Sequence, residues 1–155
     1  MQIPGIDRIG AAVIIAELGV DMTAFPTARH AAAWAGVCPS NNESAGKRKG
    51  QPGRKGNPHL TSALVQAAVA ASRKKGTYLK DKYWRLKARR GPMRAALAIA
   101  HKILIAAYHM LASGEDHRDL GETHLDKLSA AATKNGLVKR LERLGYRVTL
   151  EEAAV

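Results

Sequence analysis

The stretch GPMRAALAIAHKILIAAYHML, residues 91–111, decides the fold that this sequence predicts. Between Met93 and Leu111 apolar residues stand almost all the way round a helix, which is typical of a central buried helix. Ala dominates the apolar residues and aromatics make up only 5 % of the chain, so the core should consist of closely packed helices. We therefore predict an all-α fold. The central-helix residues expected to face inward are Ala96, Leu97, Ala100, Ile103, Leu104 and Ala107.

Helix caps mark the elements that precede this stretch. Asn57-Pro58 combines an N-cap with Pro at the first helical position. Gly76-Thr77 then starts another helix, which ends at Gly91-Pro92. The first of these helices should bury Leu60, Leu64, Ala67, Ala68 and Ala71, and the second Leu79, Tyr83 and Leu86.

Weaker patterns flank these helices. Ile9, Ala12, Val13, Ala16 and Leu18 form a helical repeat that ends at Gly19. The next short helix has Thr27 as N-cap and is stopped by Gly36. Its inward residues should be Ala31, Trp34 and Ala35.

The composition changes after Gly114, where residues 115–119 read as a polar linker. A last helix with Leu137, Val138, Leu141 and Leu144 follows, and Tyr146, Val148 and Leu150 alternate as in one short strand. We predict a helical domain over residues 1–114 and a helix–strand appendage over 115–155.

The composition excludes several classes of protein. The chain has 155 residues and one cysteine, Cys38, which rules out a disulfide framework or a Cys-based zinc cluster and favours a small core residue. Its six histidines are scattered without ligand spacing, so no metal site is expected within the chain. No uninterrupted apolar run approaches the roughly 18 residues of a membrane span. With no export leader at Met1, we expect a cytoplasmic protein without a membrane partner.

The positive charge is concentrated in one stretch. The formal net charge is +12, residues 44–72 contain five bases and no acid, and residues 73–94 contain ten bases and one acid. Such clustering is typical of nucleic-acid binding. A solvated basic face is the plainer alternative, and charge by itself does not exclude a membrane surface.

The chain opens with Ile3-Pro4-Gly5-Ile6 and a small-residue helix, as in the second half of a helix-hairpin-helix. In that motif the backbone N–H groups at the turn, here those of Gly5 and Ile6, contact a DNA phosphate. Asp7 stands where the motif usually has a second glycine, and its carboxylate opposes a phosphate. A turn that merely packs two helices is an equal alternative.

Residues 37–58 lack periodicity and read as a long Gly-rich loop of the kind that is usually functional. Gly46-Lys47 is not part of a phosphate-binding P-loop, because Arg48 replaces the required Ser or Thr. What remains is the hydroxyl of Ser44 close to many cations. Such cations would neutralise a phosphate under attack by a serine, although a serine in a basic loop usually only forms hydrogen bonds. The cations are Lys47, Arg48, Lys49, Arg54 and Lys55.

A second basic region follows the loop, on the helix after Gly76 and the start of the central helix. The bases expected to contact nucleic-acid backbone there are Lys80, Arg85, Arg89, Arg90 and Arg94. Tyr78, Tyr83 and Trp84 lie among them and could stack on exposed bases, but their helical spacing suits core packing at least as well.

These residues occur in an order that resembles a known family. The segments are Ile3-Pro4-Gly5-Ile6, Phe25-Pro26-Thr27-Ala28-Arg29-His30, Trp34-Ala35-Gly36, Cys38-Pro39, Asn42-Glu43-Ser44-Ala45-Gly46-Lys47, Arg54-Lys55-Gly56-Asn57-Pro58, Leu64-Val65-Gln66-Ala67-Ala68, Tyr108-His109-Met110-Leu111 and residues 141–150. Together they look like the C-terminal domain of the IS110/IS116 family of insertion-sequence transposases, related to the pilin-gene inverting recombinase.

The resemblance implies a function. Family members join an N-terminal RuvC-like domain with a DEDD metal site to a helical domain with a nucleophilic serine, and they exchange DNA strands under the guidance of a bridge RNA. By position Ser44 matches that serine, with Ser40 as the fallback in the same loop. Because Met1-Gln2 runs directly into Ile3, the chain is expected to be a fragment that lacks the RuvC-like domain. The implied cofactor is Mg²⁺ bound by that domain, and the implied partners are DNA, a guide RNA and further copies of the full-length protein.

Two other functions stay open. The chain could be a non-catalytic nucleic-acid-binding module, in which the basic loop and helix only clamp phosphates. It could also be a basic ribosome-associated protein, which would prefer RNA and not bind DNA.

Overall fold

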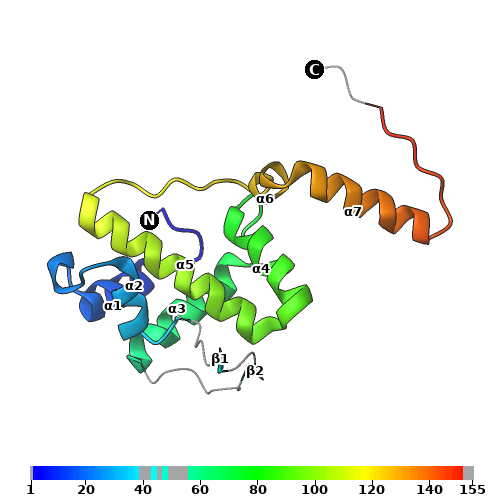
Figure 1. Ribbon diagram of the computed structural model, residues 1–155. Helices are drawn as coiled ribbons and strands as arrows, with labels where there is room; N and C mark the ends of the chain where they lie inside the picture. The colour runs from blue at the N-terminus through cyan, green and yellow to red at the C-terminus, as the bar shows by residue number, and fades with distance from the viewer. Residues whose placement is uncertain (1, 39–42, 45–46, 49–55, 152–155) are drawn as a thin grey trace.

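The computed structural model describes residues 2–38, 43–44, 47–48 and 56–151. The described residues form an α-helical body with one short β-ladder, which confirms the all-α prediction (Figure 1). The elements are α1 (Arg8–Leu18), the 3₁₀ helix η1 (Met22–Ala24), α2 (Ala28–Trp34), β1 (Glu43–Ser44), β2 (Lys47–Arg48), α3 (Pro58–Ala71), α4 (Tyr78–Arg90), α5 (Pro92–Ser113), α6 (His124–Leu128) and α7 (Ala130–Arg143).

Helix α5 is the centre of the body, as residues 91–111 predict. It packs against α2, α3 and α4, and Ile99, Ile103 and Leu104 on it are fully buried. By length and composition α5 could cross a membrane, but its contacts on several sides make it the core helix of the bundle. The prediction that Leu97 faces inward is wrong. This side chain is 38 % exposed, because its position on α5 points away from the neighbouring helices.

The predicted caps of the next helices are confirmed. The Asn57 side chain accepts hydrogen bonds from the backbone N–H groups of His59 (3.0 Å) and Leu60 (3.1 Å). The five residues predicted to line α3 are all buried. Thr77 caps α4, and Gly91, with φ of 81°, ends it. A left-handed backbone at this position favours glycine, which explains the sharp α4–α5 corner.

The N-terminal helices differ from the predicted faces. In α1 the structure buries Ile14 and Leu18 and leaves Ile9 74 % exposed. Trp34 of α2 is 44 % exposed and packs against Phe25 instead of entering the core. Helix α1 is apolar from Ile9 to Ala16, and α2 is short and rich in alanine, so hydrophobic periodicity does not distinguish the buried face from the exposed one.

The turn at Ile3-Pro4-Gly5-Ile6 packs against α3. Gly5 has φ of 90°, and a side-chain carbon there would overlap the backbone of Ala67 and Ala71. The Ile6 N–H is bonded to the Ile3 carbonyl, and the Asp7 carboxylate caps α1 by accepting from the Gly10 N–H at 2.7 Å. The turn therefore has a packing role, and a phosphate contact at Gly5 and Ile6 stays a prediction.

The C-terminal segment is built differently. In the described part of the chain the buried apolar residues run from Ile3 to Ala107, and α6 and α7 contribute none. The helix predicted at Leu137–Leu144 is present as α7, but its leucines are exposed. The strand predicted at Tyr146–Leu150 is wrong: these residues are irregular, since no second strand among the described residues lies beside them.

Candidate nucleic-acid interface

The two ends of the Ser44 loop meet at its base. Gly56 lies so close to Ala35 and Gly36 that a side-chain carbon on it would overlap their backbone. The Thr61 hydroxyl donates a 2.6 Å hydrogen bond to the Ala35 carbonyl from the first turn of α3. The segment between Val37 and Gly56 therefore leaves and re-enters the body at one place, between α2 and α3.

Within this loop the structure places Ser44 opposite a cation-bearing residue. Strands β1 and β2 are antiparallel, and their register pairs Ser44 with Lys47 and Glu43 with Arg48. Directly opposed residues of such a pair have Cα atoms about 4.5–5.5 Å apart. Of the other residues predicted in the loop, Ser40, Lys49, Arg54 and Lys55 lie outside the described residues.

A histidine that the sequence analysis did not assign to the site lies beneath the start of the loop. The imidazole of His101 in α5 is partly buried and lies close to the backbone of Val37. Burial lowers the pKa of its imidazole, the Lys102 charge lowers it further, and the Val37 backbone opposes both. Its Nδ1 is buried and has no partner among the described residues. His101 therefore favours the neutral form and packs the loop base onto α5.

The second basic region forms an exposed corner where α4 meets α5. Arg89, Arg90 and Arg94 are exposed, and none forms an ion pair with a side chain that the structure describes. Helix α5 starts with Gly91-Pro92 and has no side-chain cap. Free backbone N–H groups and the helix dipole attract anions at such a terminus. In the view of Figure 1 the corner and the β1–β2 ladder lie on the same side of the body, opposite α7.

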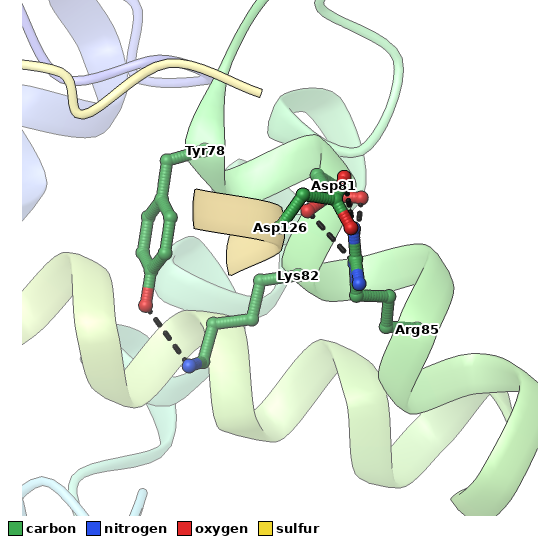
Figure 2. Close-up of polar contacts among 5 residues, drawn as sticks. All are labelled: Tyr78, Asp81, Lys82, Arg85 and Asp126. Carbon is green, nitrogen blue, oxygen red and sulfur yellow. Dashed lines mark hydrogen bonds and ion pairs between the residues drawn. The ribbon is translucent and has the colours of Figure 1, made fainter. Parts of the chain in front are cut away.

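Arg85, predicted with this group, has carboxylate partners instead (Figure 2). Its Nε lies 2.9 Å from both oxygens of Asp81, and its Nη2 lies 2.8 Å from Asp126 of α6. The hydrogen bonds that Arg85 donates to Asp81 and, second, to Asp126 raise the pKa of this guanidinium. The geometry gives Arg85 a role in holding α6 on α4, and its contact with nucleic acid stays a prediction.

The three aromatic residues of this region, Tyr78, Tyr83 and Trp84, differ in how far they are buried. Tyr83 is buried, so the packing alternative is correct there. Tyr78 is partly buried, and its hydroxyl accepts a 2.9 Å hydrogen bond from Lys82 (Figure 2). Trp84 is 50 % exposed, on the same helix as Lys80 and Arg89.

The described residues contain no group of three or more His, Cys, Asp or Glu side chains that could hold a metal ion.

Comparison with known proteins gives the family to which the chain belongs. The chain belongs to the Transposase IS116/IS110/IS902 family, whose family model matches residues 1–84. The protein named "Putative transposase y4pF/y4sB" of Sinorhizobium fredii is 33 % identical over 126 residues. That match covers 76 % of this chain and 31 % of the relative, so the chain spans about a third of the relative's length. No solved structure matches.

Proposed function

We propose that this chain is the serine-bearing, nucleic-acid-binding part of a DNA transposase that cleaves and rejoins strands through Ser44. The observation that supports this most directly is the β1–β2 register, in which Ser44 is paired with Lys47. Both residues lie inside the family-matched segment 1–84, at the start of the basic stretch.

The proposed reaction is a phosphoryl transfer to the serine. The Ser44 Oγ attacks a backbone phosphorus, the bond from phosphorus to the 3′ oxygen breaks, and the leaving oxygen takes up a proton as the hydroxyl loses one. The products are a 5′-phosphoserine link and a free 3′ hydroxyl. Attack by a 3′ hydroxyl of another strand reverses the step and rejoins DNA. Cations stabilise the charge on the phosphoryl oxygens during both steps, and we assign this role to Lys47, Arg48, Lys49, Arg54 and Lys55.

The exposed corner of α4 and α5 supplies the backbone contacts in this proposal. Arg89, Arg90 and Arg94 bind phosphates beside the uncapped start of α5, and Lys80 adds a charge on α4. The partners are the DNA substrate and a guide RNA, and the working form is an oligomer of the full-length protein in the cytoplasm. Any Mg²⁺ is supplied by an N-terminal domain of that protein.

Alanine variants of the full-length transposase test the serine. Ser44→Ala should abolish the covalent protein–DNA adduct and lower strand cleavage by at least about 10³-fold, since the nucleophile is removed. Its affinity for DNA should not change. Ser40→Ala is the matched control from the same loop and should retain the adduct. An adduct that persists in Ser44→Ala would exclude Ser44, and its loss in Ser40→Ala would assign the role to Ser40.

The second candidate function is a non-catalytic nucleic-acid-binding module. The exposed arginines of the α4–α5 corner favour it, because exposed guanidinium groups can bind phosphates without any chemistry at Ser44. In this case Ser44→Ala is silent in every assay, while Lys47→Ala weakens binding and flattens its salt dependence.

A further inference from the structure

Trp84 is held rigidly although half of it is exposed. Its indole N–H donates a 3.1 Å hydrogen bond to the Ser72 carbonyl, at the end of α3. The buried ring of Tyr83 lies edge-on to it, with ring centroids 5.8 Å apart. A large apolar ring that is exposed yet fixed at two points is pre-organised, so a stacking partner costs it little conformational entropy.

The surroundings of Trp84 are suited to a nucleotide. The Lys87 ammonium lies over one face of the ring, 4.1 Å from its centroid, so a base would stack on the opposite face. From its position the ammonium can neutralise a phosphate linked to that base. A hollow of about 400 Å³ borders the ring. The other side chains that line this hollow are Lys80, Asp81, Glu122, Thr123 and Asp126.

The charges of the hollow favour a base over a phosphate as its occupant. Three carboxylates and one ammonium, that of Lys80, line it, so the excess of negative charge repels a phosphate from its interior. An ionised carboxylate accepts about four hydrogen bonds. Asp81, Glu122 and Asp126 use some of this capacity on Arg85 and the Gly76 N–H. The remainder can accept from the amino group of adenine, cytosine or guanine.

We infer that Trp84 stacks on an unpaired, amino-bearing nucleobase that enters the hollow, while Lys87 and Lys80 contact its phosphates. The inference rests on the proposed nucleic-acid binding and adds a preference for single-stranded over duplex segments at this site. It does not depend on the chemistry of Ser44. A base within a duplex is excluded, because its faces are covered by its neighbours.

Fluorescence of the 155-residue chain tests the stacking directly. The chain has two tryptophans, so Trp34→Phe leaves Trp84 as the single indole reporter. An oligoadenylate of about 12 nucleotides, long enough for a single-strand site, should quench it saturably. The duplex of the same sequence should not. Trp84→Phe, with Trp34 as the remaining reporter, is the matched control and should show no quenching.

Binding measurements then quantify the base contact. Trp84→Ala should weaken oligoadenylate binding by about 5- to 100-fold, the range that stacking contacts contribute. Trp84→Phe should recover part of this, since it keeps a ring without the indole N–H. An abasic oligomer should bind equally to wild type and Trp84→Ala, and oligouridylate should bind more weakly than oligoadenylate. RNA and DNA versions of the oligomer decide which nucleic acid supplies the base.

The outcomes separate this inference from the proposed function. If the oligomer binds while Trp84 fluorescence and both Trp84 variants are unaffected, the stacking site is wrong and nucleic-acid binding stands. If neither oligomer nor duplex binds to the chain, both proposals are wrong.

Discussion

The helical body and the C-terminal segment are held by different forces. From Ile3 to Ala107 the body encloses an apolar core, whereas α6 and α7 bury no residue. The C-terminal segment is attached by carboxylates: Asp119 accepts from the Tyr78 N–H at 3.1 Å, Glu122 from the Gly76 N–H at 3.2 Å, and Asp126 pairs with Arg85. Changes in the segment should therefore leave the fold of the body and its basic surface intact.

The largest contrast should come from leucine truncation. Leu104→Ala removes a fully buried side chain of α5 and should cost about 3 kcal/mol of unfolding free energy, through lost transfer energy and a cavity. Leu137→Ala in α7, where 58 % of the leucine is exposed, should cost less than about 0.5 kcal/mol. Urea denaturation measures both, and equal costs would contradict the division.

Glycine substitution should give opposite effects in the two regions. Gly56→Ala places a methyl group against the Ala35–Gly36 backbone and should destabilise the body by about 1–3 kcal/mol. It should also separate the two ends of the Ser44 loop. Gly136→Ala meets nothing in α7 and should raise helix stability by about 0.5–1 kcal/mol. Denaturation of the body and helicity from circular dichroism report the two effects. A neutral Gly56→Ala would show that the loop ends do not meet.

Removal of the Arg85–Asp126 ion pair, which holds α6 on α4, should have a local effect. The Arg85–Asp126 pair is 40 % and 46 % exposed on its two side chains, so Arg85→Ala should change global stability by less than about 1 kcal/mol. Amide hydrogen exchange in α6 should nevertheless become faster, because the helix loses its anchor on α4. Arg89→Ala is the control on the same helix. Unchanged exchange in α6 would assign its attachment to other contacts.

The smallest expected effect is a pH dependence from His101. Burial keeps the pKa of this imidazole below its ordinary 6.5, so the unfolded chain binds more protons than the folded one as the pH falls below that value. The stability contributed by the neutral His101 is present above pH 6.5 and lost on acidification. His101→Gln should flatten the decline of Tm between about pH 7 and about pH 5, whereas His109→Gln, at an exposed position of α5, should not.

The sequence predicted the elements well where a cap coincided with a change of pattern. Asn57-Pro58, Gly91-Pro92 and Gly114 set helix boundaries through local hydrogen bonding and backbone geometry, which a sequence displays directly. It failed at Ile9, Trp34 and Leu97, because a helix that is apolar all round does not say which side its neighbours occupy.

The candidate site was predictable in its charges but not in its contacts. Counting basic residues located the basic stretch. It could not show that Arg85 forms an ion pair with Asp126, about forty residues further along the chain. Tyr83 and Trp84 are adjacent in sequence but lie on different faces of α4. Which face is buried depends on where α3 and α5 pack against this helix. The alternation at Tyr146–Leu150 misled because a strand needs a partner, which a local pattern cannot supply.

The most direct test of the central claim is to locate the DNA attachment point on the protein. Full-length transposase trapped on its DNA substrate is digested with nuclease and trypsin, and the peptide that contains both Ser40 and Ser44 is fragmented in a mass spectrometer. The account predicts a nucleotide linked through a 5′ phosphate to the Ser44 oxygen. A nucleotide on Ser40 or on any residue outside this peptide would contradict it.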